Sequence, residues 1–112
     1  MYSKELLKGT LRTIILKMLN EYGRMYGYEI TQKVKHLSGD KISLTEGALY
    51  PMLHKLEAEN LVITSTEIVN GRKRKYYEVT DIGSTQAEAK STEFVEFVQT
   101  ILLLLNPQLS KN

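Results

Sequence analysis

The sequence contains no cysteine and only two prolines. Without cysteine the chain can form no disulfide framework and offers no thiolate for catalysis or metal binding. No apolar run reaches the roughly 20 residues that span a membrane. The first ten residues also lack the apolar core and cleavage site of a secretory signal. These absences argue against a disulfide-stapled, membrane-spanning or secreted protein, and we expect the chain in the cytoplasm.

Histidine is almost as scarce, because His36 and His54 are the only two in the chain. Neither has a second metal-ligating residue at a spacing typical of a zinc site. The sequence also has no glycine-rich loop of the kind that cradles phosphates. We therefore expect no enzymatic activity, no metal and no cofactor, and we interpret both histidines as structural or surface residues.

The composition is that of a globular domain. The chain has 112 residues, of which 42% are hydrophobic and 25% charged, and this length fits one domain. The net charge is only +2, but residues 1–75 carry +5 and residues 76–112 carry −3. A basic front and an acidic tail suggest that the front binds a polyanion. A mixed solvated surface is the alternative.

Helical periodicity marks the first third of the chain. One helix is predicted over residues 3–22, ending where Gly23 can take a left-handed conformation, and a second over residues 28–37. Their predicted inward-facing side chains are Leu7, Leu11, Ile14, Ile15, Met18, Leu19, Ile30, Val34 and Leu37.

A short extended piece is expected at residues 41–43, and a third helix is then predicted to run to about residue 59. Ser43 and Glu46 have the spacing of a capping box. Its apolar side chains are Leu49, Met52, Leu53 and Leu56, and the opposite face is polar. Polar groups on an exposed helix can reach base edges and phosphates in a major groove. An ordinary amphipathic helix is the alternative.

Two strand-like runs, at residues 62–69 and 75–80, flank Asn70 and Gly71. This dipeptide favours a tight hairpin turn with positive φ at both residues. Four consecutive cations follow the turn, namely Arg72, Lys73, Arg74 and Lys75. Neighbouring cations repel one another, so the run fits a phosphate backbone or minor groove that neutralises it. A solubilising loop is the alternative.

The order of the predicted elements is that of a winged helix-turn-helix fold, mainly α with a small β-hairpin. A last helix is predicted over residues 81–105, before Pro107. We expect one compact unit, in which residues 1–80 form the winged-helix DNA-binding domain and residues 81–112 a C-terminal dimerisation helix.

These motifs together resemble the PadR family of bacterial transcription regulators, and in particular its short, LmrR-like subgroup. The matching segments are residues 26–30, 47–53, 55–57, 61–62, 71–77 and 80–83. The resemblance covers roughly residues 4–105. It implies a homodimeric, sequence-specific repressor that binds an inverted-repeat operator in double-stranded DNA, with the third helix in the major groove and the wing alongside.

The residues expected at the DNA are Tyr26, Thr45, Glu46, Gly47, Tyr50, Pro51, His54, Lys55, Arg72, Lys73 and Arg74. A winged-helix protein–protein adaptor without DNA binding is the alternative function. The run of cations at the wing distinguishes the two hypotheses, because an adaptor has little use for it.

Three local features make sharper predictions. Pro51 falls inside the third helix, where proline clashes with the carbonyl of Gly47, so we expect a bend or an irregular first turn. Asn60 stands where the family usually has glycine, and asparagine tolerates the left-handed conformation of a helix cap. Tyr76 and Tyr77 should point to opposite faces of a strand, one of them onto the core.

The last helix carries more apolar surface than one helix face can bury on so small a domain. An exposed patch of this kind usually marks an interface, and we expect the homodimer there. The predicted interface residues are Leu6, Leu7, Phe94, Phe97, Val98, Ile101, Leu102 and Leu105. Folding of this helix back onto its own domain is the alternative.

The resemblance also implies an effector site. In the short subgroup an aromatic residue of the last helix lines a central pore, and Phe94 falls at that place, with Leu6 and Val98 as neighbours. A small hydrophobic or aromatic effector between two Phe94 rings would then relieve repression. Simple packing of Phe94 in the dimer core is the alternative.

Overall fold

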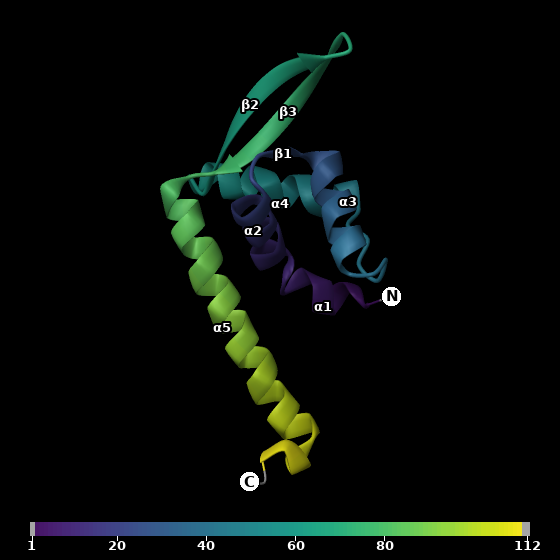
Figure 1. The fold of residues 1–112 in the computed structure, drawn as a ribbon, viewed down its shortest axis with the longest axis vertical. Helices are drawn as coiled ribbons and strands as arrows, with labels where there is room; N and C mark the ends of the chain where they lie inside the picture. The colour runs from purple at the N-terminus through teal and green to yellow at the C-terminus, as the bar shows by residue number, and fades with distance from the viewer. Residues whose placement is uncertain (1, 111–112) are drawn as a thin grey trace.

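The computed structural model describes residues 2–110, and side chains as far as residue 108. It contains five α-helices, a three-stranded antiparallel sheet and a final 3-10 turn within that range (Figure 1). In chain order the elements are α1 (Lys4–Lys8), α2 (Leu11–Tyr22), β1 (Met25–Tyr26), α3 (Gly27–Leu37), α4 (Glu46–Ala58), β2 (Val62–Val69), β3 (Arg72–Val79), α5 (Asp81–Leu105) and η1 (Pro107–Ser110).

The core lies where α2, α3 and α4 pack against the base of the sheet. Its most deeply buried side chains are Ile15, Leu16, Leu19, Ile30, Leu49, Leu53, Leu56, Val62 and Tyr77. No polar or charged side chain of residues 2–108 is buried. This arrangement confirms the predicted winged helix-turn-helix fold with a small β-sheet.

The single helix predicted over residues 3–22 is wrong, because the chain breaks between α1 and α2. Gly9 has a low helix propensity, and Thr10 takes a φ of −115°. The Thr10 hydroxyl donates to the Leu7 carbonyl at 3.1 Å, which offers that carbonyl a partner outside the helical ladder. α1 is left with no buried residue, and Leu16, absent from the predicted inward face, is fully buried.

The ends of α2, α3 and α4 differ from the predictions. Gly23 ends α2 with φ 84° and ψ −166°. Its φ is positive as expected, but its ψ lies outside the left-handed helical region. Leu37, predicted to face inward, is 51% exposed at the end of α3. Residues 41–43 form no strand. The capping box of Ser43 is also wrong: Thr45 caps α4, and its hydroxyl oxygen accepts the Ala48 N–H at 3.2 Å.

Pro51 does not interrupt α4, which runs unbroken from Glu46 to Ala58. In the first turn the Thr45 carbonyl accepts both the Ala48 N–H at 3.1 Å and the Leu49 N–H at 2.9 Å. Pro51 therefore causes no break in α4, and the bend expected there stays a prediction.

The wing is a regular two-residue hairpin. Val62 pairs with Val79 at its base and Val69 with Arg72 at its tip. Asn70 and Gly71 have φ values of 52° and 77°, which confirms the predicted turn. β3 begins at Arg72 rather than at residue 75, so the cations lie within a strand.

The two adjacent tyrosines of β3 divide as predicted. Tyr77 is buried in the core, while Tyr76 lies on the outer face of the sheet. β1, which the sequence did not predict, pairs with β3 through Met25 opposite Tyr77 and Tyr26 opposite Tyr76.

α5 has the predicted bounds and only its first half packs on the core. Asn60 takes the expected positive φ of 61° before β2. Gly83 and Ala87 are the buried residues of α5, which runs beside α2 and then extends away from the other helices (Figure 1). The molecule is accordingly elongated, with extents of 59 × 30 × 20 Å. Among residues 2–110, no helix is both long and apolar enough to cross a bilayer.

Candidate nucleic-acid interface

The face of α4 opposite the core is solvent-exposed. Six of the residues expected at the DNA are exposed on it: Thr45, Glu46, Gly47, Pro51, His54 and Lys55. The apolar side of the same helix is fixed by Leu49, Leu53 and Leu56, all fully buried. The helix therefore presents its polar side at a defined orientation, as a recognition helix requires.

Tyr50 differs from these residues because it is half-buried and packs against the core. Its hydroxyl lies over Gly27, the first residue of α3, so closely that a Cβ at Gly27 would overlap it. Tyr50 thus joins α4 to α3 and also reaches the surface between α4 and the wing.

A cleft of about 430 Å³ separates α4 from the wing. Its lining residues are Tyr26, Gly27, Tyr50, His54, Lys73, Arg74, Lys75 and Tyr77. The structure thus brings together the expected residues of β1, α4 and β3, which are up to about fifty positions apart in the sequence. The lining holds three cations and no carboxylate, which suits an anionic group.

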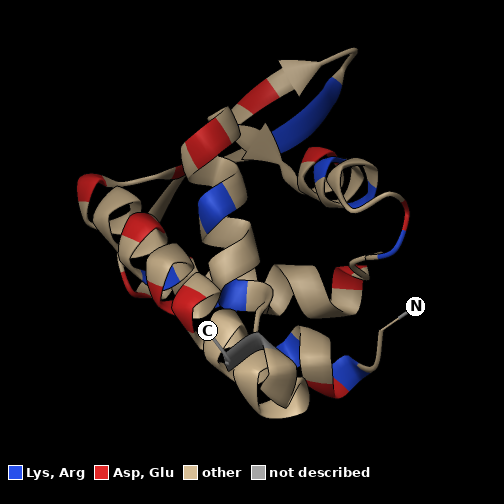
Figure 2. Ribbon diagram, turned by 60° about the horizontal axis from the view of Figure 1, so that its bottom comes forward, with Lys and Arg blue, Asp and Glu red and all other residues tan. Residues whose placement is uncertain are grey.

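The four cations of the wing leave β3 from its two faces. Successive side chains of a strand point to opposite faces, so Arg72 and Arg74 lie on one face and Lys73 and Lys75 on the other. Figure 2 shows the run as a blue stretch at the start of β3. The Lys75 ammonium lies 3.8 Å from the Glu57 carboxylate. Within the described residues, Arg72 and Lys73 have no ion-pair partner.

Arg74 is held against the protein rather than free. Its guanidinium carbon lies 4.1 Å from the centroid of the Tyr26 ring. A side-chain hydrogen bond with Tyr76 is the main reason that the pKa of Arg74 is raised. The Tyr26 ring in turn meets the Tyr76 ring edge-on, with centroids 5.6 Å apart.

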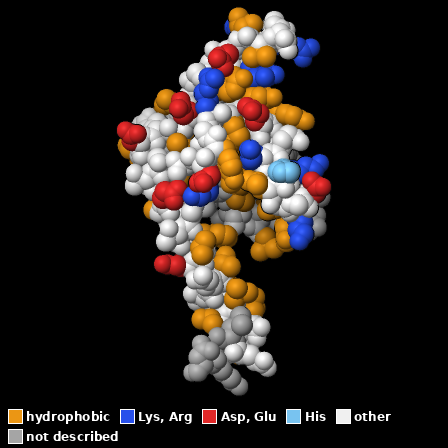
Figure 3. Space-filling view, viewed as in Figure 1, with side chains coloured by type: hydrophobic (Ala, Val, Ile, Leu, Met, Phe, Trp, Pro, Cys, Tyr) orange, Lys and Arg blue, Asp and Glu red, His pale blue; other side chains and the backbone are white. Residues whose placement is uncertain are grey.

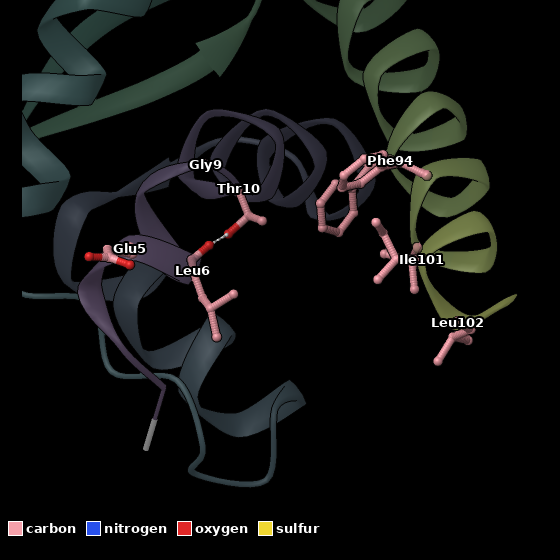
Figure 4. Close-up of a pocket in the computed structure, with 9 residues that line it drawn as sticks. Glu5, Leu6, Gly9, Thr10, Phe94, Ile101 and Leu102 are labelled. Carbon is pink, nitrogen blue, oxygen red and sulfur yellow. Dashed lines mark hydrogen bonds between the residues drawn. The ribbon is translucent and has the colours of Figure 1, made fainter. Parts of the chain in front are cut away.

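A second surface, apolar this time, lies between α1 and the outer half of α5. A groove of about 340 Å³ is lined by Glu5, Leu6, Gly9, Thr10, Phe94, Phe97, Val98, Ile101 and Leu102. Figure 4 shows Phe94 and Ile101 pointing from α5 toward Leu6 and Thr10. The space-filling view shows apolar side chains along this part of α5 (Figure 3).

Most of the expected interface and effector residues meet in this groove, but two do not. Leu7 points away from it and lines a separate cavity of about 690 Å³ beside the start of α4. Leu105 lies beyond the groove, 76% exposed near the end of α5. Residues 2–110 contain no cluster of three histidines or carboxylates able to hold a metal ion.

Residues 15–89 match the model of the transcriptional regulator PadR-like family. The chain belongs to this family. A transcriptional regulator of Mycobacterium tuberculosis is 31% identical over 78 residues, which cover 70% of each chain. A PadR-like transcriptional regulator of Bacillus cereus superposes with a TM-score of 0.76 at 31% identity, covering 92% of this chain and 98% of the other.

The structure of Bacillus subtilis PadR in complex with operator DNA is also similar. It superposes with a TM-score of 0.64 at 31% identity, over 70% of this chain and 45% of the other. The PadR-like family consists of transcriptional regulators, and its winged-helix architecture agrees with the fold described above.

Arg24, at the site of this PadR-like chain, was not predicted from the sequence. Arg24 lies just before β1, and its guanidinium carbon is 4.2 Å from the centroid of the Tyr76 ring. It also forms an ion pair with Glu67 at 2.9 Å. A single arginine after the Gly23 turn carries no periodic signal, and its partners lie about 40 and 50 positions downstream, so only the fold reveals it.

Proposed function

We propose that the chain is a homodimeric transcriptional repressor that inserts α4 into the major groove of an inverted-repeat operator and lays the wing along the adjacent backbone. The observation that carries this proposal is the cleft in which the exposed face of α4 meets the wing cations. The similarity to Bacillus subtilis PadR, whose structure contains operator DNA, supports it.

Within this proposal the cations have distinct roles. Arg72 and Lys73 lack ion-pair partners in the described chain and are available to phosphates. The residues of the first turns of α4, Thr45, Glu46 and Gly47, face the bases, where polar groups read their edges. His54 and Lys55 follow on the exposed face and complete the contact.

The salt dependence of DNA affinity tests the role of the wing. Each phosphate contact contributes about 0.9 to the slope of log affinity against log salt. Arg72→Gln removes one contact from each subunit and should reduce the slope by about 1.8 in a dimer. Lys90→Gln, which removes the same charge from α5, is the matched control and should leave the slope unchanged. An unchanged salt slope in Arg72→Gln would show that the wing does not contact the DNA backbone as proposed.

The second copy of the chain is proposed to cover the outer half of α5. Phe97 and Leu102 are 57% and 46% exposed there, and so large an apolar surface is typical of an interface. Sedimentation of Leu102→Glu should show monomers, because a carboxylate in this groove would be buried without a partner. Gln99→Glu adds the same charge outside the groove lining and should remain dimeric. A dimeric Leu102→Glu would place the interface elsewhere.

The effector is proposed to be a small hydrophobic or aromatic molecule bound between the subunits near Leu6, Phe94 and Val98. It can lower DNA affinity only if it prefers a dimer whose recognition helices are wrongly spaced. Titration with a planar dye should show binding and release of the operator, and both should weaken in Phe94→Ala. Ile68→Ala removes an exposed apolar side chain from the wing and serves as the control for dye binding. Equal dye binding by a dimeric Phe94→Ala would refute this site.

The remaining candidate is a winged-helix adaptor that binds another protein and no DNA. The cation-lined cleft beside α4 favours DNA over this alternative. A gel shift on the region upstream of the chain's own gene separates the two functions, because an adaptor would leave the duplex unshifted.

A further inference from the structure

Four side chains contact one another in a continuous row on the outer face of the sheet, here named the wing brace: Arg24, Tyr76, Tyr26 and Arg74. The guanidinium carbon of Arg24 lies 4.2 Å from the centroid of the Tyr76 ring. The Tyr76 and Tyr26 rings meet edge-on at 77°, with centroids 5.6 Å apart. The guanidinium carbon of Arg74 ends the row, 4.1 Å from the Tyr26 centroid.

The wing brace crosses all three strands. Tyr26 belongs to β1, and Tyr76 and Arg74 belong to β3. Arg24 reaches over to β2, where its guanidinium donates to the Glu67 carboxylate at 2.9 Å and to the Ser65 hydroxyl at 3.3 Å. The segment before α3 is therefore tied to both strands of the wing on one face.

The opposite face of the wing is held by α4. The Glu57 carboxylate accepts the Thr64 hydroxyl at 3.2 Å and lies 3.8 Å from the Lys75 ammonium. Since β1 pairs only with Tyr76 and Tyr77, the wing beyond them is a two-stranded hairpin. Such a hairpin has little stability of its own, so contacts on its two faces control its angle to the helices.

We propose that Arg24 and Tyr76 are positioning residues that fix the angle between the wing and α4. In the same arrangement the Tyr26 ring supports the Arg74 guanidinium (here called the Tyr26 shelf) and does not contact DNA directly. This inference rests on the proposed DNA binding. Arg24 is already engaged by Glu67 and by the Tyr76 ring, so it acts through the wing and not on a phosphate.

Amide hydrogen exchange of the full chain tests the brace without any DNA. Arg24→Gln removes an ion pair and a cation–π contact. Together they correspond to about a two- to tenfold change in the equilibrium constant for local opening of the wing. Exchange in residues 66–75 should rise by that factor. Arg12→Gln is the matched control, because Arg12 also pairs with a carboxylate, that of Glu59 at the end of α4, but neither residue belongs to the wing brace. Unchanged exchange in Arg24→Gln would overturn the proposal.

Operator binding then separates positioning from contact. Arg24→Gln should weaken affinity about two- to tenfold while leaving the salt slope at the parent value, because no phosphate contact is lost. A slope reduced as much as in Arg72→Gln would make Arg24 a phosphate ligand and refute the proposal. A parent that binds no duplex would overturn the DNA-binding function itself, and the exchange result would still report on the brace.

Two substitutions at Tyr26 isolate its ring from its hydroxyl. Tyr26→Phe keeps the ring under Arg74 and should match the parent in hydrogen exchange. Tyr26→Leu removes the ring and should behave like Arg24→Gln. If Tyr26→Phe weakens DNA binding as much as Tyr26→Leu with unchanged exchange, the hydroxyl contacts DNA and the shelf is refuted.

Discussion

Replacing Gly83 with alanine should loosen the docking of α5 on the winged-helix core. Gly83 is buried in the first turn of α5, and a Cβ there would overlap the Leu61 carbonyl oxygen and lie 2.9 Å from its carbonyl carbon. The same carbonyl accepts the Thr80 N–H at 3.0 Å, and the Thr80 hydroxyl donates to the Asn60 carbonyl at 2.7 Å. The obstacle is backbone, so no side-chain rotation relieves it.

The change in the free energy of unfolding follows from one stabilising and two destabilising effects. Alanine in a helix is favoured over glycine by about 1 kcal/mol. Overpacking of a tight contact costs about 1–3 kcal/mol. Loss of the Thr80 cap, whose hydroxyl accepts the Gly83 N–H at 3.0 Å, costs about 1 kcal/mol more. The net expectation is a loss of about 1–3 kcal/mol, or roughly 5–15 °C in melting temperature for a domain of this size.

Thermal unfolding followed by circular dichroism measures this effect. The chain concentration must be the same for all variants, because self-association changes apparent stability. Gly9→Ala is the matched control: Gly9 has a φ of −73° and no atom within 4 Å of an added Cβ. It should equal or slightly exceed the parent. A Gly83→Ala variant as stable as Gly9→Ala would show that the α5 contact does not hold the helix in place.

Three further predictions concern the core and its surface. Asn60→Ala should cost about 1–2 kcal/mol in urea unfolding, whereas Asn60→Gly should not, because residue 60 has a φ of 61°. Gly27→Ala should destabilise the parent by about 1–3 kcal/mol through its overlap with Tyr50, and a double-mutant cycle should show a smaller cost in a Tyr50→Leu background. The hydrogen bond from Lys17 lowers the pKa of Glu88. The ionised Glu88 therefore stabilises the fold above the ordinary glutamate pKa, and this stabilisation is lost as pH falls through the lowered pKa. In Glu88→Gln the free energy of unfolding should accordingly fall less steeply at acid pH.

The elements predicted best were those whose signals are local. Asn70 and Gly71 specify their turn by the two positive φ values that they accept most easily. The bounds of α5 were predicted correctly: apolar residues at helical spacing mark its second half, and Thr80 caps its start as such residues do. Asn60 also behaved as its tolerance of left-handed backbone predicts.

The features that sequence missed depend on contacts between distant segments. β1 is two residues long and exists because Met25 and Tyr26 pair with β3. The break before α2 is the exception, because its cause is local: the Thr10 hydroxyl donates to the Leu7 carbonyl in the preceding turn. Contacts between distant segments also limit prediction of the candidate site: the exposed side of α4 can be inferred from its spacing, but the ring contacts that join Arg24 to Arg74 cannot.

The central claim is that α4 and the wing together bind a specific DNA site. The most direct measurement is the affinity of the unmodified chain, by fluorescence anisotropy at several salt concentrations, for a duplex from upstream of its own gene and for a random duplex of equal length. The account predicts two chains per duplex, an affinity at least about a thousandfold tighter for the upstream duplex, and a steep loss of binding with salt. Equal affinity for the two duplexes, or no binding to either, would contradict it.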